Sequence, residues 1–261
     1  MTDRRERHRI PIVRAPKSRP RLRGPLAALG ALALAAASGA VEYRITFTPL
    51  WTPDQLDDPD APRPGLHFTD LVGAAHAAGD PLWAPGGLAT AGVENVAEAG
   101  IATQLFGEVS ARIAQGDASA WILAGGILLR EGTGSSETTF ATTRAHPEVS
   151  LLSMVAPSPD WFVGISGVSL LDVGGAWIDQ LSFDVRPWDA GTEEGNLFEL
   201  GNPASAPHGP IHQLWDSPFL GRPALARITL ERIGAIPEPA TGALLALGLL
   251  GLARRRRVSR S

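Results

Sequence analysis

The chain has 261 residues, no cysteine and a formal net charge of −4, but its charge is unevenly distributed. Residues 41–236 hold nine basic residues, all of them Arg, against 24 acidic ones, a net charge of −15. Such a segment repels phosphate backbones, which argues against nucleic acid as a partner and against direct attraction to anionic lipid. Without disulfides the fold depends on apolar burial, for which a chain of this length suffices.

Residues 1–40 have the layout of a secretory signal peptide. Nine Lys and Arg residues precede an apolar run over residues 25–37, and small residues follow at 38–40, as at a signal-peptidase site. A buried alanine-rich helix is the alternative interpretation, but no polar face interrupts the run. We therefore expect export, with cleavage near Ala40.

The middle of the chain predicts one β-rich domain over residues 41–233. Residues 43–47 alternate apolar with polar and predict a strand, and the Pro- and Asp-rich stretch 52–65 predicts a loop. Apolar residues at spacings of three and four over 93–115 predict a helix or two, with Gly100 and Gly107 as candidate breaks. Further strands are expected over 121–129, 137–143, 149–155, 162–168, 180–185 and 225–233. Short strands between Gly- and Pro-rich turns indicate an all-β, antiparallel β-sandwich.

Two acidic loops follow predicted strands, at residues 157–161 (PSPDW) and 187–195 (PWDAGTEEG). If Asp160, Asp189 and Glu193 meet, their charges repel one another unless a cation lies between them. Calcium, a hard divalent ion that prefers oxygen ligands, suits such a cluster. The alternative is that these are three solvated loop acids, the usual role of acids in turns.

The strings PSPDWFVGI (residues 157–165) and PWDAGT (187–192) resemble the spondin domain of animal extracellular-matrix proteins. The resemblance covers about 41–233, since further stretches agree with that domain in order: 67–76, 82–89, 146–156 and 226–233. It implies a C2-like sandwich of about eight strands, with one or two short helices. It also implies that Asp160, Asp189 and Glu193 hold a Ca²⁺ ion, with Glu193 standing where the animal proteins have Asp.

Residues 237–257 resemble the PEP-CTERM sorting tail of Gram-negative bacteria. A Pro-Glu-Pro motif at 237–239 precedes an apolar segment at 240–253 and an arginine block at 254–257. The apolar segment is shorter than the ~20 residues of a normal spanning helix, and the arginine block is expected on the cytoplasmic side. The resemblance implies processing by an exosortase, contact with the membrane only transiently through the tail, and a place on the cell surface or in a biofilm matrix. A plain C-terminal anchor is the alternative.

The histidine residues could suggest a zinc site, but the spacing between them does not support one. His208 and His212 stand four apart, but the Gly-Pro pair between them precludes the helix that this spacing needs. We expect loop histidines without a metal role. His67 and His76 are expected to hydrogen-bond the loops that carry them.

Catalysis is the main rival to metal binding. Asp189 and Glu193 could form the acid pair of a carbohydrate hydrolase, which requires one carboxyl of raised pKa and a cleft for sugar. Ser166 lies in a segment that nearly, but not fully, matches a nucleophile motif, and it is expected to be a strand residue. Trp161 and Trp188 are expected in the core more than in a sugar site.

Together these features predict an exported calcium-binding protein that is not an enzyme and acts as a binding or adhesion component. The expected ligand is an exopolysaccharide, a surface glycan or a surface protein. A purely structural surface module is a further alternative.

Overall fold

A computed structural model describes residues 39–51, 65–125, 129–130, 134–215, 218–219, 221 and 223–235. All of them belong to one compact unit that begins at residue 36. The predicted signal peptide up to residue 38, the predicted loop over 52–64 and the predicted sorting tail lie outside the described residues. Within the described ranges, no helix has the length and apolarity to cross a membrane.

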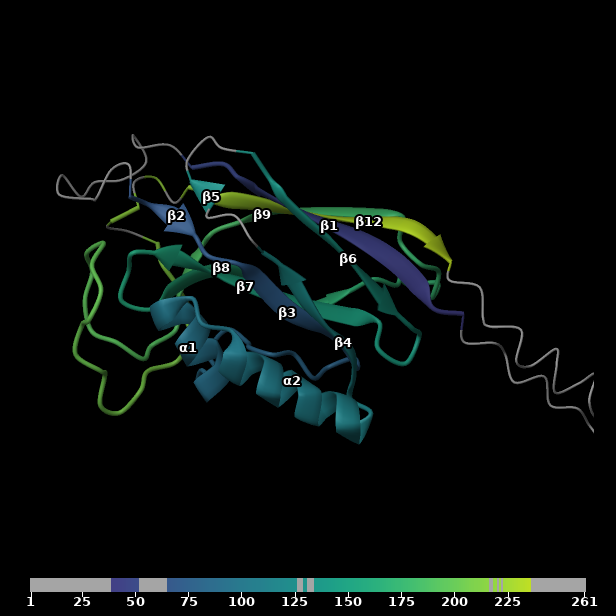
Figure 1. Ribbon diagram of the computed structural model, residues 1–261, viewed down its shortest axis with the longest axis horizontal. Coiled ribbons are helices and arrows are strands. Elements are labelled where there is room, and N and C mark those ends of the chain that lie inside the picture. The colour runs from purple at the N-terminus through teal and green to yellow at the C-terminus, as the bar shows by residue number, and fades with distance from the viewer. Residues whose placement is uncertain are drawn as a thin grey trace, which may run out of the picture. The chain divides into compact units, whose positions relative to one another are not determined.

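The domain is built on two antiparallel sheets that pack face to face (Figure 1). The first has the order β6-β1-β12-β9, with bounds Ser136–Thr142, Val41–Pro49, Ala226–Ala235 and Gln180–Val185. In the second, β11 (His212–Gln213), β10 (Pro187–Asp189), β8 (Trp161–Ser169) and β7 (Glu148–Ala156) lie side by side. Beyond β7 lie β3 (Leu71–His76) and β4 (Ala118–Ala124), and also β2 (His67–Phe68) and β5 (Leu129–Arg130). The predicted all-β sandwich is confirmed, and eight of these described strands have six residues or more.

Strand β1 shows why the first sheet has one buried face. Its residues alternate between buried and partly exposed along its whole length. Tyr43, Ile45 and Phe47 point into the core between the sheets, as the period of two requires. On the other face, Arg44 pairs with Glu231 of β12 at 3.3 Å.

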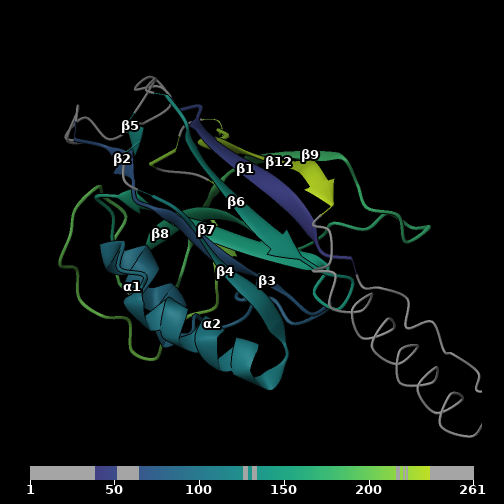
Figure 2. The ribbon, with the colours of Figure 1, turned by 45° about the vertical axis from the view of Figure 1, so that its right-hand side comes forward.

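The middle of the second sheet is buried on both faces, because helices α1 (Ala91–Ala99) and α2 (Thr103–Gln115) cover its outer side (Figure 2). In β7, Leu151 packs into the core between the sheets and Leu152 into the core under the helices. Strand β3 is likewise buried at every position. It therefore has no polar–apolar alternation from which sequence analysis can detect a strand.

The helical region divides at Gly100, as expected. Gly100 ends α1 in the left-handed region, with φ 68°, and its N–H reaches the Asn95 and Val96 carbonyls. The second candidate break is wrong, because Gly107 lies inside α2. A Cβ at Gly107 would meet nothing within 4 Å, so the residue stands at an open position where the helix simply continues.

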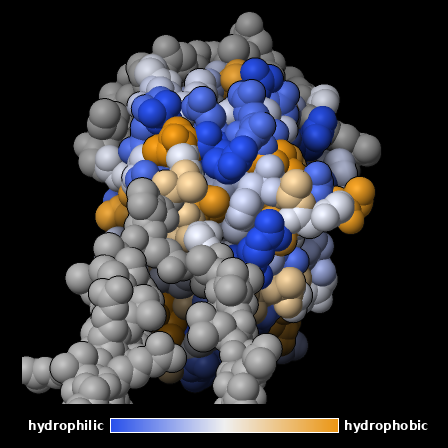
Figure 3. All heavy atoms as spheres, turned by 90° about the vertical axis from the view of Figure 1, so that its right-hand side faces the viewer, coloured by the Kyte–Doolittle hydropathy of each residue, from blue (hydrophilic) through white to orange (hydrophobic). Residues whose placement is uncertain are grey.

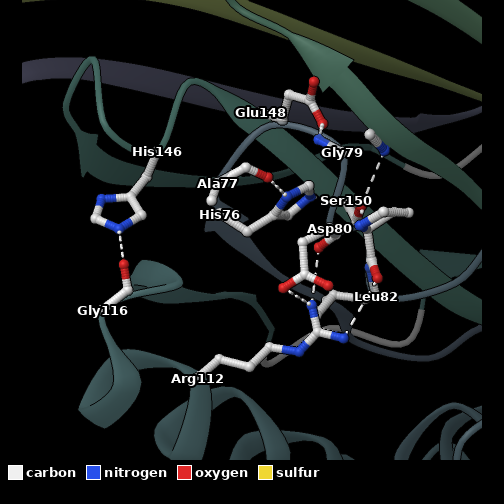
Figure 4. A network of polar contacts seen from close by, with 12 residues as sticks. His76, Ala77, Gly79, Asp80, Leu82, Arg112, Gly116, His146, Glu148 and Ser150 are labelled. Carbon is white, nitrogen blue, oxygen red and sulfur yellow. Dashed lines mark hydrogen bonds and ion pairs between the residues drawn. The ribbon is translucent and has the colours of Figure 1, made fainter.

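A polar network fixes the end of β3 to β7 (Figure 4). His76 is fully buried. One ring nitrogen lies 2.9 Å from the Ala77 carbonyl, and the other lies 2.8 Å from Ser150 Oγ. Ser150 Oγ also accepts from the Gly167 amide at 2.9 Å. Burial lowers the pKa of His76, which favours the neutral ring. Through Ser150, the ring also bonds beyond the loop that carries it.

The same network attaches helix α2 to the sheet (Figure 4). Arg112 of α2 donates to the Asp80 carbonyl at 2.8 Å and lies 3.0 Å from the Asp80 carboxylate. His146 bonds the Gly116 carbonyl just beyond the helix at 2.8 Å. His67, by contrast, bonds within its own loop, to the Gly65 carbonyl at 2.8 Å, as predicted.

Candidate metal centre

Asp160 lies at the end of the turn between β7 and β8. The Trp161 amide donates to Ser158 Oγ at 3.0 Å, which closes this turn. The Asp160 side chain has no exposed surface. Its Oδ2 accepts from the Thr192 amide at 2.6 Å, the Thr192 hydroxyl at 3.2 Å and the Glu193 amide at 3.1 Å. The Asp160 side chain, at the end of the first acidic loop, therefore holds the second acidic loop in place through these hydrogen bonds.

Asp189 is the last residue of β10 and pairs with Trp161 across the ladder between β8 and β10. Its Oδ1 accepts from the Gly191 amide at 2.8 Å, which shapes the start of the loop. Gly191 has φ 75°, and a Cβ there would collide with the Gly209 carbonyl. Only glycine suits this position, since the backbone is left-handed and another backbone segment lies against it.

The two carboxylates are electrostatically unfavourable neighbours. The pKa of Asp189 is raised to about 6, first by burial and then by the negative charge of Asp160. The bond from the Gly191 amide and the nearby His212 and Trp161 side chains act in the opposite direction. Burial and like charge prevail, so the ionised pair is strained in the absence of a cation.

One oxygen of this pair has no partner. Asp160 Oδ1 is buried and accepts no hydrogen bond. Buried polar atoms are nearly always paired, and an unpaired charged group is costly. A cation held by Asp160 Oδ1 would satisfy this oxygen and relieve the repulsion from Asp189, and carboxylate oxygens are ligands that calcium prefers.

Glu193 contributes differently from the two aspartates. Its amide contacts Asp160, while its half-buried side chain has a pKa raised by burial and by the charges of Glu98 and Asp160. Within the described ranges, no group of three or more His, Asp or Glu side chains is arranged so that it could hold a metal ion. The three-residue calcium set therefore stays a prediction, built on a pair that the fold brings together.

Glu98 of α1 is the acidic neighbour that sequence reasoning missed. Burial raises its pKa, and the Thr192 side chain, which also bonds Asp160, offsets part of that rise. The charges of Glu94 and Asp160 raise it further. No motif marks Glu98, because it belongs to a helix distant in sequence that reaches the loop only through the fold.

His208 and His212 both lie near acidic residues of the candidate metal centre. His212 Nδ1 is 3.8 Å from Asp189 Oδ1, and the nearby His208 acts to lower the pKa of Glu98. His212 belongs to the short strand β11, not to a helix, in keeping with the argument against a helical zinc pair.

The remaining candidates behave as structural residues. Ser166 lies in β8, as predicted, and its hydroxyl donates to the Trp83 carbonyl. Trp161 is fully buried and packs edge-to-face on Phe198 at 5.3 Å, which confirms its place in the core. Trp188 is half-buried and packs beside Trp83 at 5.3 Å, in the core under the helices.

Comparison with known proteins assigns this chain to a family. Residues 41–219 match the spondin N-terminal family (Spondin_N). The chain is 30% identical over 226 residues to human Spondin-2, covering 80% of this chain and 67% of that protein. It is 32% identical over 215 residues to chicken Spondin-1, covering 76% of this chain but 26% of that much longer protein. The chain therefore belongs to the spondin-domain family.

The C-terminal signal is also recognised. Residues 235–257 match the PEP-CTERM protein-sorting motif, which implies processing by exosortase-type sorting. Together with the spondin family, this motif indicates an exported protein.

Proposed function

We propose that the domain is an extracellular calcium-binding module that works by binding, not by catalysis. Asp160, Asp189 and Glu193 would supply the carboxylates, with Glu98 contributing negative charge nearby. The observation that carries the proposal is the buried, unpaired Oδ1 of Asp160 beside a second buried carboxylate whose pKa is raised to about 6. Each feature is unfavourable alone, and one divalent cation offsets both.

The ion would act on the long loop that follows β10. Beyond the Asp160 contacts, this loop is closed by bonds from Glu194 N to the Pro203 carbonyl and from Ser205 N to the Thr192 carbonyl, both 2.8 Å. Phe198 anchors it against Trp161, while Leu197 and Leu200 remain exposed. A cation that fixes the base of the loop would preorganise this exposed surface for a ligand.

We further propose that the ligand is a polysaccharide of the cell's own matrix or surface, in a Gram-negative bacterium. The sorting motif favours this setting, because the PEP-CTERM tail that these residues resemble is associated with exopolysaccharide and biofilm production. The net charge of −15 over residues 41–236 disfavours anionic partners unless calcium bridges them.

A pull-down tests this function. Immobilised protein is incubated with exopolysaccharide from the producing organism, in millimolar calcium or in chelator. We expect the wild-type protein to retain the polysaccharide in calcium and to lose it in chelator. The variant Asp160→Asn should not retain it in either condition. Retention that is equal with and without calcium would contradict a calcium-dependent binding role and favour a structural module.

A carbohydrate hydrolase is the second candidate, because a carboxyl with a pKa of about 6 suits a general acid. The assay is release of reducing sugar from the same polysaccharide by the calcium-loaded protein. We expect no turnover. Sustained release that disappears in Asp189→Asn would establish the hydrolase instead.

A further inference from the structure

The two ends of the spondin domain leave it side by side. Val41, the first residue of β1, pairs with Ala235, the last residue of β12. The predicted signal peptide ends immediately before Val41, and the sorting motif begins at residue 235. Both segments directed to the membrane therefore join the domain at one point.

The candidate metal centre lies at the opposite end of the sandwich. The β1–β12 ladder runs from the Val41–Ala235 pair to the Pro49–Ala226 pair, a length of about 27 Å at 3.4 Å per residue. Ala226 also pairs with Val185, the last residue of β9. The chain then passes directly into β10 and its terminal Asp189. In Figure 1 the green loop that follows β10 accordingly lies on the left and the arrowhead of β12 on the right.

The connection to the membrane segment is short. Four residues, 236–239, separate Ala235 from the apolar segment that starts at Ala240, and two of them are Pro. Even fully extended, the five steps from Ala235 to Ala240 reach at most about 18 Å. The strand pair at this end is thus held close to the lipid as long as the tail is in the membrane.

Charge opposes the alternative in which the domain lies flat. With a net charge of −15 over residues 41–236, the domain has no electrostatic attraction to anionic headgroups that would draw its long side onto the bilayer. Basic residues flank both apolar segments on the side away from the domain, so both segments place the domain on the non-cytoplasmic side. Adjacent ends at Val41 and Ala235 agree with this topology, because both membrane-directed segments then join the domain at the same end.

We propose that, until the sorting tail is cut, the domain stands on the bilayer with its Val41–Ala235 end toward the lipid. The acidic loops at the far end then face the aqueous exterior, where they meet soluble or matrix partners and not the membrane that holds the tail. Figure 3 looks onto the lipid-facing end, where hydrophilic side chains predominate and hydrophobic ones are scattered among them. This orientation goes beyond the proposed function and does not depend on calcium binding.

The absence of cysteine allows a direct test. Val173 is exposed between the bridged residues Leu171 and Trp177. This hairpin lies at the lipid-facing end, since Tyr43 of β1 donates to the Ile178 carbonyl at 2.6 Å. Leu200 is exposed on the loop of the candidate metal centre. Single variants Val173→Cys and Leu200→Cys therefore place one fluorophore at each end without disturbing the core.

The uncut protein, produced in a host without exosortase, is labelled and inserted into liposomes that carry a quencher on the lipid headgroup. In detergent, soluble iodide should quench both labels alike, because both sites are exposed. In the quencher liposomes, we expect the label at position 173 to be quenched several-fold more than the label at position 200. Equal quenching, stronger quenching at position 200, or no quenching at either position would overturn the proposed orientation.

Discussion

Asp189 lies beside Asp160 because the backbone register of β10 on β8 sets Asp189 opposite Trp161, the residue that follows Asp160. The Ala190 amide donates to the Asp160 carbonyl at 3.1 Å and continues this register into the loop. Two acids that are distant in sequence thus become neighbours through main-chain pairing. Their repulsion is therefore a property of the fold, which side-chain movement alone cannot remove.

Variants at Asp160 separate its structural role from its proposed metal role. Asp160→Ala removes the acceptor of the Thr192 amide, the Thr192 hydroxyl and the Glu193 amide. We expect a loss of about 2–4 kcal/mol in the free energy of unfolding, measured by urea denaturation in chelator. Asp160→Asn keeps one acceptor oxygen and should lose less, yet calcium should stabilise neither variant. A calcium response in Asp160→Asn equal to that of the wild type would contradict the assignment.

The raised pKa of Asp189 predicts an inverse pH dependence of stability in chelator. A carboxyl with a folded pKa of about 6 and an ordinary value of 3.8 binds its proton more tightly in the folded protein. The free energy of unfolding should therefore fall as pH rises from about 4 to about 6, by at most about 3 kcal/mol from this group. Glu98 and Glu193, also raised, add in the same direction.

Urea denaturation across pH 4–7 measures this dependence. Asp189→Asn keeps an acceptor for the Gly191 amide but cannot ionise, so it should lose most of the fall. Saturating calcium should reduce the fall in the wild type, because the ion stabilises the ionised form. A wild-type profile that rises steadily over pH 4–6 in chelator would contradict the raised pKa.

The strands and the acidic pair could be foreseen from sequence to different degrees. Strand β1 alternates visibly, and the predicted bounds of β9 agree with the structure. Strand β3 was not predicted, because it lacks alternation and half of its residues are Gly or Ala, which are depleted in strands. The sequence and the family resemblance together singled out Asp160 and Asp189. They could not show that Asp160 Oδ1 is left without a partner, since that depends on the packing of three-dimensional neighbours.

Glu98, which no sequence motif marks, lies near the acidic pair, and its charge provides a prediction. If its charge supports the metal centre, Glu98→Gln should weaken calcium binding by up to roughly tenfold, the effect of about 1.4 kcal/mol. Glu194→Gln is the matched control, because Glu194 is an exposed neighbour of Glu193. Calorimetric titration of both variants decides the matter. An equal effect of the two would mean that only overall charge counts.

The buried Ser150 provides a prediction that is independent of the metal. Ser150→Ala leaves the His76 ring and the Gly167 amide without their partner. We expect a loss of about 1–3 kcal/mol in the free energy of unfolding, with the calcium response of the melting temperature unchanged. A large change in calcium affinity in this variant would show that the network of Figure 4 is coupled to the metal centre.

The most direct test of the calcium centre is the melting temperature of the domain titrated with calcium at constant ionic strength. Extracellular calcium modules have Kd values of about 10⁻⁴–10⁻³ M, and calcium at ~100 times Kd adds about 2.7 kcal/mol of stability. We predict a rise for the wild type, a flat response for Asp189→Ala and Glu193→Ala, and a retained rise for Glu193→Asp. A wild-type melting temperature that does not change up to saturating calcium would contradict the account.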